Sequence, residues 1–333
     1  MTLHSQTMGT AMASDGSKAI SDGSKAISDR SKAAPNGPEP APHGLADAAP
    51  RPLLGALDRG RGPQGDASGT APAALPQIRR IEALGFRAWP AASSLYDGSW
   101  LVRLTAGHPS RRLNSINPLD RMDATNIEAR VARLSRRFTS YDRAPVFRRT
   151  PLAPAALFAW LDREGWGTEG ETRVLLADAS AVSTHEALDR VPLGDVGLFV
   201  EAALAVRPRD VRYKSGLTEV LSAIRPPKGM FTIREGDEPV ATALCVHDGD
   251  YAGLFEVAVR EDRRGRGLAR AITLSAMRWA RLHGAERFWC QVEADNAPAS
   301  RLYDAVGMAE IYRYHYRTAP EIEPAHRAVE ELI

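Results

Sequence analysis

A short basic loop rich in glycine, between a strand pattern and a helix pattern, constrains this chain more than any other feature. Residues 257–269 read Val-Ala-Val-Arg-Glu-Asp-Arg-Arg-Gly-Arg-Gly-Leu-Ala. Gly265 and Gly267 let the backbone turn so that its N–H groups converge, and the following helix N-terminus adds partial positive charge. Three arginines can add charge-assisted contacts to phosphate: Arg264, Arg266 and Arg270. The segment therefore predicts a diphosphate site, although alone it fits a plain strand-to-helix turn equally well.

A second segment follows after one intervening strand pattern and adds to this prediction. Residues 296–307 read Asn-Ala-Pro-Ala-Ser-Arg-Leu-Tyr-Asp-Ala-Val-Gly. Asn296 suits a helix cap or a hydrogen bond near the helix start, and Pro298 suits the first turn. Helical spacing turns Tyr303 inward, toward the sheet. Taken alone, such a tyrosine is more often a core aromatic than a functional group.

In this order and spacing, the two segments resemble the GNAT acyltransferase superfamily. Arg264-x-x-Gly267-x-Ala269 fits the family's R/Q-x-x-G-x-G/A pattern, and the later segment fits N-x-x-A-x-x-L-Y-x-x-x-G-[FM]. The likeness covers residues from about 228 to 317 and includes the order of the strands. It implies an N-acetyltransferase that uses acetyl-CoA as co-substrate, without a metal.

The resemblance also implies where the coenzyme binds. The strands at 254–259 and 287–293 would splay apart and admit the pantetheine arm, which would pair with main-chain groups of Val257 and Val259. Asn296 would contact the coenzyme from the other side. The diphosphate would lie on a run of consecutive residues with one further arginine: Arg264, Gly265, Arg266, Gly267, Leu268, Ala269 and Arg270.

Direct attack of an amine on a thioester needs an oxyanion donor, a general acid and a general base. The Val257 N–H is the expected oxyanion donor. Tyr303, with an ordinary pKa of about 10, can protonate the departing thiolate. Glu256 can take the amine proton directly or through water, or it can be a solvated carboxylate on an outward-facing strand position. His315 and Cys290 are weaker candidates for the base.

The chain divides into four parts by composition. Residues 1–76 are rich in Ala, Ser, Gly, Pro and Asp, and within them a seven-residue unit is repeated at 14–20, 21–27 and 28–34. Each copy holds too little apolar surface for a coiled coil, so we predict a disordered low-complexity tail. Residues 77–190 are expected to form a degenerate GNAT-like or accessory α/β domain. Residues 191–320 are expected to form the acyltransferase domain, and 321–333 a C-terminal tail.

Hydrophobic periodicity and turn residues predict the elements of the middle region. Helices are expected from Ile78, at 126–138 and at 154–164, and strands from Trp100, at 145–149 and at 173–177. This order echoes the end of a GNAT unit and suggests a tandem arrangement that walls the acceptor pocket, or a purely structural partner. The polar residues Asn114, Ser115 and Asn117 contact an acceptor or, more simply, cap a turn.

The same reasoning predicts the elements of the last third. Residues 198–224 are mostly helical, and a long helix at 265–283 has Leu268, Ile272, Ser275, Trp279 and Leu282 on one face. A helix at 298–306 follows. Strands are expected at 230–234, 239–246, 251–259, 287–293 and 308–316. The fold class is therefore α/β (α+β), with a mixed, mainly antiparallel sheet flanked by helices.

Bulk properties limit the other functions. The formal net charge of +2 is nearly balanced, so the arginine clusters are weak evidence for nucleic acid. No apolar run is long enough to span a membrane, and Cys245 and Cys290 fit reduced core residues in the cytoplasm. We expect a small-molecule or peptide amine as acceptor. The alternatives are a non-catalytic acyl-CoA sensor and a nucleic-acid-binding protein that uses Arg263 to Arg270. The oligomeric state cannot be read from the sequence.

Overall fold

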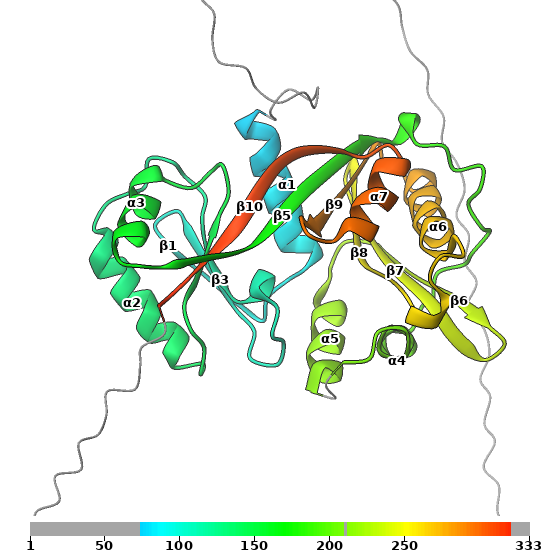
Figure 1. The fold of residues 1–333 in the computed structure, drawn as a ribbon, viewed down its shortest axis with the longest axis horizontal. Coiled ribbons are helices and arrows are strands. Elements are labelled where there is room, and N and C mark those ends of the chain that lie inside the picture. Colours follow the sequence, from blue (N-terminus) through cyan, green and yellow to red (C-terminus); the bar gives the residue numbers. More distant parts are fainter. Residues whose placement is uncertain (1–73, 210–211, 321–333) are drawn as a thin grey trace, which may run out of the picture. The chain divides into compact units, whose positions relative to one another are not determined.

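The computed structural model describes residues 74–209 and 212–320, which build a single ten-stranded sheet with helices packed against it (Figure 1). The expected disordered tail and its seven-residue repeats lie outside the described residues. The exception is the end of that tail, where Leu75 and Pro76 already belong to the first helix. The expected C-terminal tail after residue 320 also lies outside them.

The same order of elements occurs twice along the chain. In the first half one helix, and in the second half two, precede three antiparallel strands, and then a helix, a strand, a short helix and a long last strand follow. The first half comprises α1 (Leu75–Ala88), β1 (Ser93–Asp97), β2 (Trp100–Leu104), β3 (Ser115–Pro118), α2 (Ile127–Thr139), β4 (Val146–Arg149), α3 (Ala155–Arg163) and β5 (Gly167–Asp178). The second comprises α4 (Val196–Val206), α5 (Arg212–Ala223), β6 (Lys228–Glu235), β7 (Glu238–Asp248), β8 (Tyr251–Val259), α6 (Leu268–Leu282), β9 (Arg287–Glu293), α7 (Ala297–Ala305) and β10 (Ala309–Thr318).

The two halves exchange their last strands. The strand order is β1-β2-β3-β4-β10-β5-β9-β8-β7-β6, so β10 pairs with β4 of the first half, and β5 pairs with β9 of the second. Strands β5 and β10 also pair antiparallel with each other and cross the centre of the sheet (Figure 1). In each half the third and fourth strands are parallel to each other: β3 with β4 in the first half, and β8 with β9 in the second.

A buried ion pair joins helix α1 to the centre of this sheet. Arg148 on β4 forms a bidentate contact with Glu82 on α1, and both side chains are almost fully excluded from solvent. The Tyr312 hydroxyl on β10 donates a hydrogen bond of 2.6 Å to the same carboxylate. Because a buried charge is costly without partners, this cluster ties the first helix to a strand that the chain supplies last.

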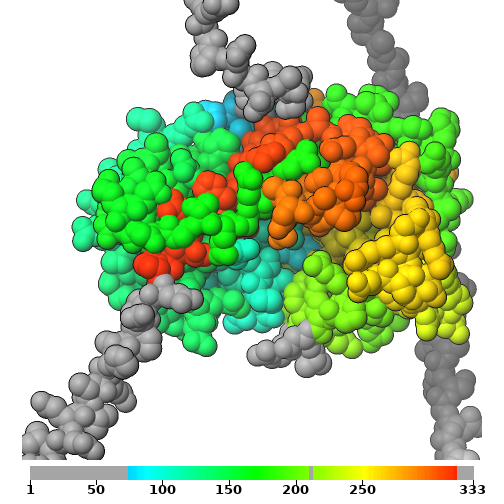
Figure 2. Space-filling view, viewed as in Figure 1, coloured from blue at the N-terminus to red at the C-terminus, as the bar shows by residue number. Residues whose placement is uncertain are grey.

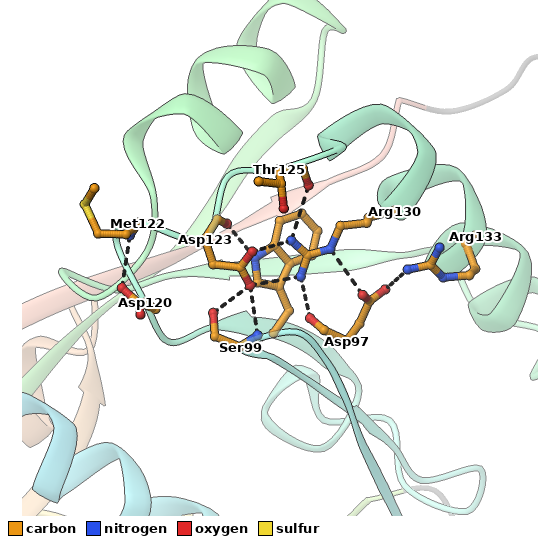
Figure 3. Close-up of polar contacts among 9 residues, drawn as sticks. Asp97, Ser99, Asp120, Met122, Asp123, Thr125, Arg130 and Arg133 are labelled. Atoms are coloured by element: carbon orange, nitrogen blue, oxygen red, sulfur yellow. Dashed lines mark hydrogen bonds and ion pairs between the residues drawn. The ribbon is translucent and has the colours of Figure 1, made fainter.

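A second network fixes the start of the first half (Figure 3). Arg130 on α2 pairs with Asp97 at the β1–β2 turn and with Asp123 in the loop after β3, at 3.2 and 2.7 Å. Asp123 also accepts hydrogen bonds from the main-chain N–H and the hydroxyl of Ser99, and Arg130 holds its pKa at about 2. The guanidinium lies 3.7 Å from the ring centre of Trp100.

Most elements predicted from the sequence are confirmed, and several details differ: for example, the strand expected at 173–177 already begins at Gly167. The predicted helix at 198–224 consists of two helices, α4 and α5, and the long helix begins at Leu268 because Gly267 takes a left-handed conformation. Of the five residues expected on one face of this helix, Ile272 and Ser275 are buried, whereas Leu282 is 77% exposed. Cys245 and Cys290 are buried and free, as expected. No helix among residues 74–209 and 212–320 has the length and apolarity needed to cross a membrane.

Candidate functional site

The sheet opens between the parallel strands β8 and β9. Their pairing runs from Tyr251 with Arg287 to Leu254 with Cys290 and then stops, although β8 continues to Val259 and β9 to Glu293. The divergence expected between these strands is therefore present, and it exposes the far halves of both strands to a cavity.

A β-bulge re-aims the backbone at the point of divergence. The register between β7 and β8 shifts so that Glu256 and Val257 together oppose one residue, Ala243. Glu256 has a φ of 45°, which is rare for a residue with a side chain and strained outside glycine. The Thr242 hydroxyl donates a hydrogen bond to its carbonyl. A bulge of this kind leaves a residue outside the ladder and turns neighbouring groups toward a ligand.

A cavity of about 450 Å³ lies at this opening. Val257 from β8, Asn296 at the start of α7 and Tyr303 within α7 line it, as do Glu256 and Gln291. The first half contributes the loop from His108 to Arg112. In Figure 2 the segments of α7 (orange), α4 and α5 (yellow-green) and the first half near residue 110 (cyan) lie on the same face. Sequence-predicted residues and residues far from them in the chain thus share one cavity.

Tyr303 is buried and neutral. Burial, together with the neighbouring Cys290 thiol, raises its pKa well above the usual 10. The phenol therefore carries its proton at neutral pH, although the raised pKa also makes it a weaker acid than an exposed tyrosine. Cys290 is a poorer candidate for a base, because burial raises the pKa of its thiol and it contacts the sulfur of Met308. His315 does not line the cavity. It lies opposite Arg149 in the backbone pairing of β10 with β4.

Glu256 faces the cavity and is mostly shielded from solvent. Its carboxylate lies 3.2 Å from the guanidinium of Arg209, and 11% of its side chain is exposed. The alternative of a solvated outward carboxylate is therefore wrong. Tyr213 also lies in this region, and burial and Glu256 raise its pKa to about 12.

The loop after β8 has the geometry expected of an anion site. Gly265 and Gly267 have φ values of 76° and 74°, and a Cβ at either position would meet no other atom within 4 Å. Gly267 is the N-cap of α6 and no side chain caps this helix, so the amides of its first turn lack intrahelical acceptors. These amides and the helix dipole favour an anion at this end.

The arginines of the loop divide into two groups. Arg263 is held by Glu235 and Asp262, and Arg270 by Glu186 and by the carbonyl of Ala305. The two guanidiniums nearest the glycines are more than half exposed and have only long ion pairs, Arg264 with Glu261 at 3.9 Å and Arg266 with Glu235 at 3.6 Å. These two remain available to a diphosphate. The many acidic partners also weaken the case for a nucleic-acid surface.

Asn296 caps α7, as expected. Its side-chain oxygen accepts a hydrogen bond of 3.1 Å from the Ala299 N–H, and the residue also lines the cavity. Asn114 of the first half caps a turn as well, since it accepts from the Thr105 N–H and donates to the carbonyls of His108 and Ser110. Ser115 and Asn117 are buried beside it in β3.

The corresponding loop of the first half has a different chemistry (Figure 3). Residues 119–126 lead from β3 into α2 without a Gly-x-Gly sequence, and Asn126 takes the left-handed N-cap position with a φ of 51°. Asp120 and Asp123 lie in this loop, and Arg130 is committed to Asp123. A loop that carries fixed carboxylates repels an anion, so of these two loops only the one in the second half has the geometry of an anion site.

Sequence reasoning did not identify several residues of the cavity. His108, Arg112, Arg209 and Tyr213 reach it from loops and helix ends that no motif marks. A second groove lies next to the cavity, and four residues line both of them: His108, Pro109, Arg209 and Tyr213.

Comparisons with known proteins agree with this geometry. A family model described as "Probable histone acetyltransferase Rv0428c C-terminal" matches residues 76–317. A relative from Bacillus subtilis, the uncharacterized N-acetyltransferase YobR, is 23% identical over 252 residues, which cover 73% of this chain and 99% of the relative.

Two solved structures share the fold. A GCN5-related N-acetyltransferase from Kribbella flavida aligns with a TM-score of 0.57 and 17% identity, over 75% of this chain and 97% of its own. A tandem GNAT protein from the clavulanic acid biosynthesis pathway aligns with a TM-score of 0.51 and 14% identity, over 76% of this chain and 91% of its own. At such identities these likenesses concern the fold alone.

Proposed function

Because the chain belongs to the GNAT N-acetyltransferases, in the family of the Rv0428c C-terminal region, we propose that it transfers an acetyl group from acetyl-CoA to a primary amine. The acceptor is a small molecule or a peptide, and its amine attacks the thioester directly. Two free, buried cysteines fit a protein that acts in the cytoplasm.

One observation supports this proposal above the others. The opening between β8 and β9 exposes Val257 to the cavity that Tyr303 also lines, and β8 continues into the glycine loop with its exposed amides at the start of α6. A long, thin ligand with a diphosphate at one end and a reactive group at the other matches this order of features.

In this proposal the coenzyme binds to residues of the second half. The pantetheine arm lies between β8 and β9 and pairs with the main chain of Val257 and Val259, and Asn296 contacts the coenzyme from α7. The diphosphate rests on the amides of residues 264–269, and Arg264 and Arg266 supply charge. Arg270 contributes less, because it already has two partners.

The chemistry follows from the groups in the cavity. The amine attacks the thioester carbon, the oxyanion is stabilised by the Val257 N–H beside the bulge, and Tyr303 protonates the thiolate as the C–S bond breaks. Glu256 takes the amine proton, with Arg209 as its ion-pair partner.

We also propose a division of labour between the halves. Residues 77–190 form a GNAT-like unit that has lost its coenzyme loop, and residues 191–320 form the acyltransferase unit. The first unit supplies the loop from His108 to Arg112 as a wall of the acceptor cavity.

A titration and a screen test the proposal. Calorimetry with acetyl-CoA is expected to show one site per chain, and a thiol-release assay against amino acids, polyamines and peptides is expected to show turnover with at least one amine. Binding without any thiol release would favour the runner-up, an acyl-CoA sensor. No binding of the coenzyme would reject both.

Tyr303→Phe tests the general acid. The variant keeps the ring in its buried position and loses the proton, so we expect kcat to fall by about 100-fold, with coenzyme affinity unchanged. Tyr251→Phe is the matched control, because Tyr251 on β8 is also a buried tyrosine but does not line the cavity. An unchanged kcat in Tyr303→Phe would remove this role.

The family's description suggests a second acceptor class, the lysine side chains of a basic protein. The cavity argues against it, since four arginines line it. A thiol-release assay with a lysine-rich peptide and a neutral peptide of equal length separates the two cases, and faster turnover of the basic peptide would favour the histone-like class.

A further inference from the structure

The cavity at the β8–β9 opening carries an excess of positive charge. Its lining holds two carboxylates, Glu256 and Glu293, and four guanidiniums, Arg111, Arg112, Arg207 and Arg209. Two of the arginines are neutralised: Arg111 lies 2.7 Å from Glu169, and Arg209 lies 3.2 Å from Glu256. Within the described ranges, the side chains of Arg112 and Arg207 have no hydrogen bond and no ion pair.

Arg112 differs from Arg207 in its surroundings. Arg207 is exposed at the rim, whereas Arg112 is half-buried between the cavity and a small void of about 20 Å³ next to it. Its guanidinium lies 5.7 Å from the ring centre of Trp89, and this is its one contact of note. A guanidinium so placed has lost part of its hydration and has gained no anion in return.

The neighbouring histidine does not change this balance. Burial and the charges of Arg209, Arg112 and Arg143 lower the pKa of His108 to about 4, so the ring is neutral at physiological pH. Its Nδ1 accepts a hydrogen bond from the Ser110 N–H, and its buried Nε2 has no partner within the described residues. The wall of the first half therefore offers donors and a positive charge, and no anion.

The phosphates of the coenzyme do not account for Arg112. Their loop, residues 264–269, follows the end of β8 that borders the cavity, but none of these residues lines the cavity itself. Arg112 does line the cavity, in the segment from His108 to Arg112 that the first half supplies, and His108 and Pro109 of this segment also border the second groove. An anion bound there belongs to the acceptor.

We propose that the acceptor carries a carboxylate near its amine and that Arg112 binds this carboxylate. The inference rests on the proposed acetyl transfer and specifies its substrate class as amino acids, or peptides with an acidic group next to the reactive amine. The planar fork of a guanidinium matches the two oxygens of a carboxylate, which fixes the distance of the amine from the reacting thioester.

Matched acceptor pairs test the substrate class. The thiol-release assay compares amino acids with the amides of the same amino acids, for example glutamate and alanine with their α-carboxamides, at equal concentration of acetyl-CoA. We expect kcat/KM to be about 10- to 100-fold higher for the carboxylate member of the preferred pair. Equal or faster turnover of the amides would overturn the proposal.

Three variants test the residue. In Arg112→Gln, kcat/KM for the carboxylate acceptor is expected to fall by about 10- to 100-fold, with little change for the amide and with the affinity for acetyl-CoA unchanged. Arg112→Lys keeps the charge without the fork, and we expect an intermediate loss. Arg207→Gln removes the same charge at the exposed rim, where salt screens it, and we expect less than about a twofold effect.

The outcomes distinguish the two levels of the argument. Equal losses in Arg112→Gln and Arg207→Gln would mean that general charge, rather than a bound carboxylate, steers the acceptor, and would overturn the role of Arg112. A cooperative thermal transition in Arg112→Gln confirms that the variant is folded. Absence of coenzyme binding in the wild type would instead reject acetyl transfer itself.

Discussion

The His108 ring stays neutral in the folded protein at mildly acidic pH, where a histidine exposed to water would be protonated. The ring is buried against Trp89 and Tyr213 and faces three arginines, so its pKa is lowered from 6.5 to about 4. Below pH 6.5 the unfolded chain takes up a proton that the folded chain refuses. The stability that depends on this residue is therefore complete above pH 6.5 and is lost as the pH falls toward 4.

The expected cost is measurable. Between pH 7 and pH 5 the folded state should lose about 2 kcal/mol through His108. His108→Asn keeps an acceptor near Nδ1 and removes the titration, so its loss over the same interval should be smaller. Urea unfolding of both proteins at the two pH values gives the comparison, and parallel losses would show that other groups dominate.

Some residues of the cavity could be predicted from the sequence and others could not. Tyr303 and Asn296 lie in a motif with fixed spacing, and the structure brings both to the cavity. Arg112 and His108 have no such pattern, because their position depends on a loop of the first half that meets the second half in space. Local spacing carries no information about such a meeting.

At the scale of elements, the start of α6 depends on one left-handed residue. Gly267 has a φ of 74° at the N-cap, a conformation that costs other residues about 1–2 kcal/mol. If the first-turn amides bind the diphosphate, any shift of this residue moves them.

Gly267→Ala is therefore expected to weaken the affinity for acetyl-CoA by about tenfold, as measured by calorimetry. Gly284→Ala is the matched control: Gly284 follows the other end of the same helix, has a φ of 96° and equally open surroundings. Both variants should lose similar stability, and only the first should lose affinity. Equal affinities of the two variants for acetyl-CoA would show that the loop at Gly267 does not bind the coenzyme.

Helix α5 contacts the first half at two glycines, Gly216 of the helix and Gly107, whose main chains lie close together. A Cβ at Gly216 would lie 2.0 Å from the carbonyl oxygen of Gly107, next to His108 in the cavity wall. A change from glycine to alanine inside a helix usually stabilises by about 1 kcal/mol. Gly216→Ala should instead lower the denaturation midpoint and raise the KM of the acceptor. A stabilised variant would show that this contact is loose.

Elements with strong periodicity could be predicted, and irregular ones could not. The limits of β8 and β9 match the sequence prediction, because both are apolar runs between turns. The short edge strand β1 has an alternating exposure and only five residues, too few for a clear pattern. The bulge at Glu256 depends on pairing with β7 and has no local signal either.

On the scale of the whole molecule, the exchange of β5 and β10 makes each half complete the other's sheet. A fragment of residues 191–333 would lack β5, one of the two partners of β9, and would leave β10 without β4 and β5. We expect it to show no cooperative unfolding by circular dichroism, whereas co-expression with residues 1–190 should restore one transition. A cooperative fragment would contradict this dependence.

The exchange could not be predicted from the sequence. Alternation along β5 and β10 predicts that both are strands in a sheet with buried faces, but either pairing, within a half or between halves, satisfies the same pattern. The order of elements was sufficient to suggest two GNAT-like units. It did not show that they share one sheet, since only the partners of the last strands decide this.

The shared sheet has a consequence for synthesis on the ribosome. Strand β5 leaves the ribosome long before β9 and β10, its two neighbours, so both of its edges lack partners until residues 287–318 have emerged. At 5–20 residues per second this takes roughly 5–30 s. During that time the nascent chain presents a bare strand of 12 residues, and its yield in the cell depends on whatever keeps that strand from pairing with a neighbouring chain.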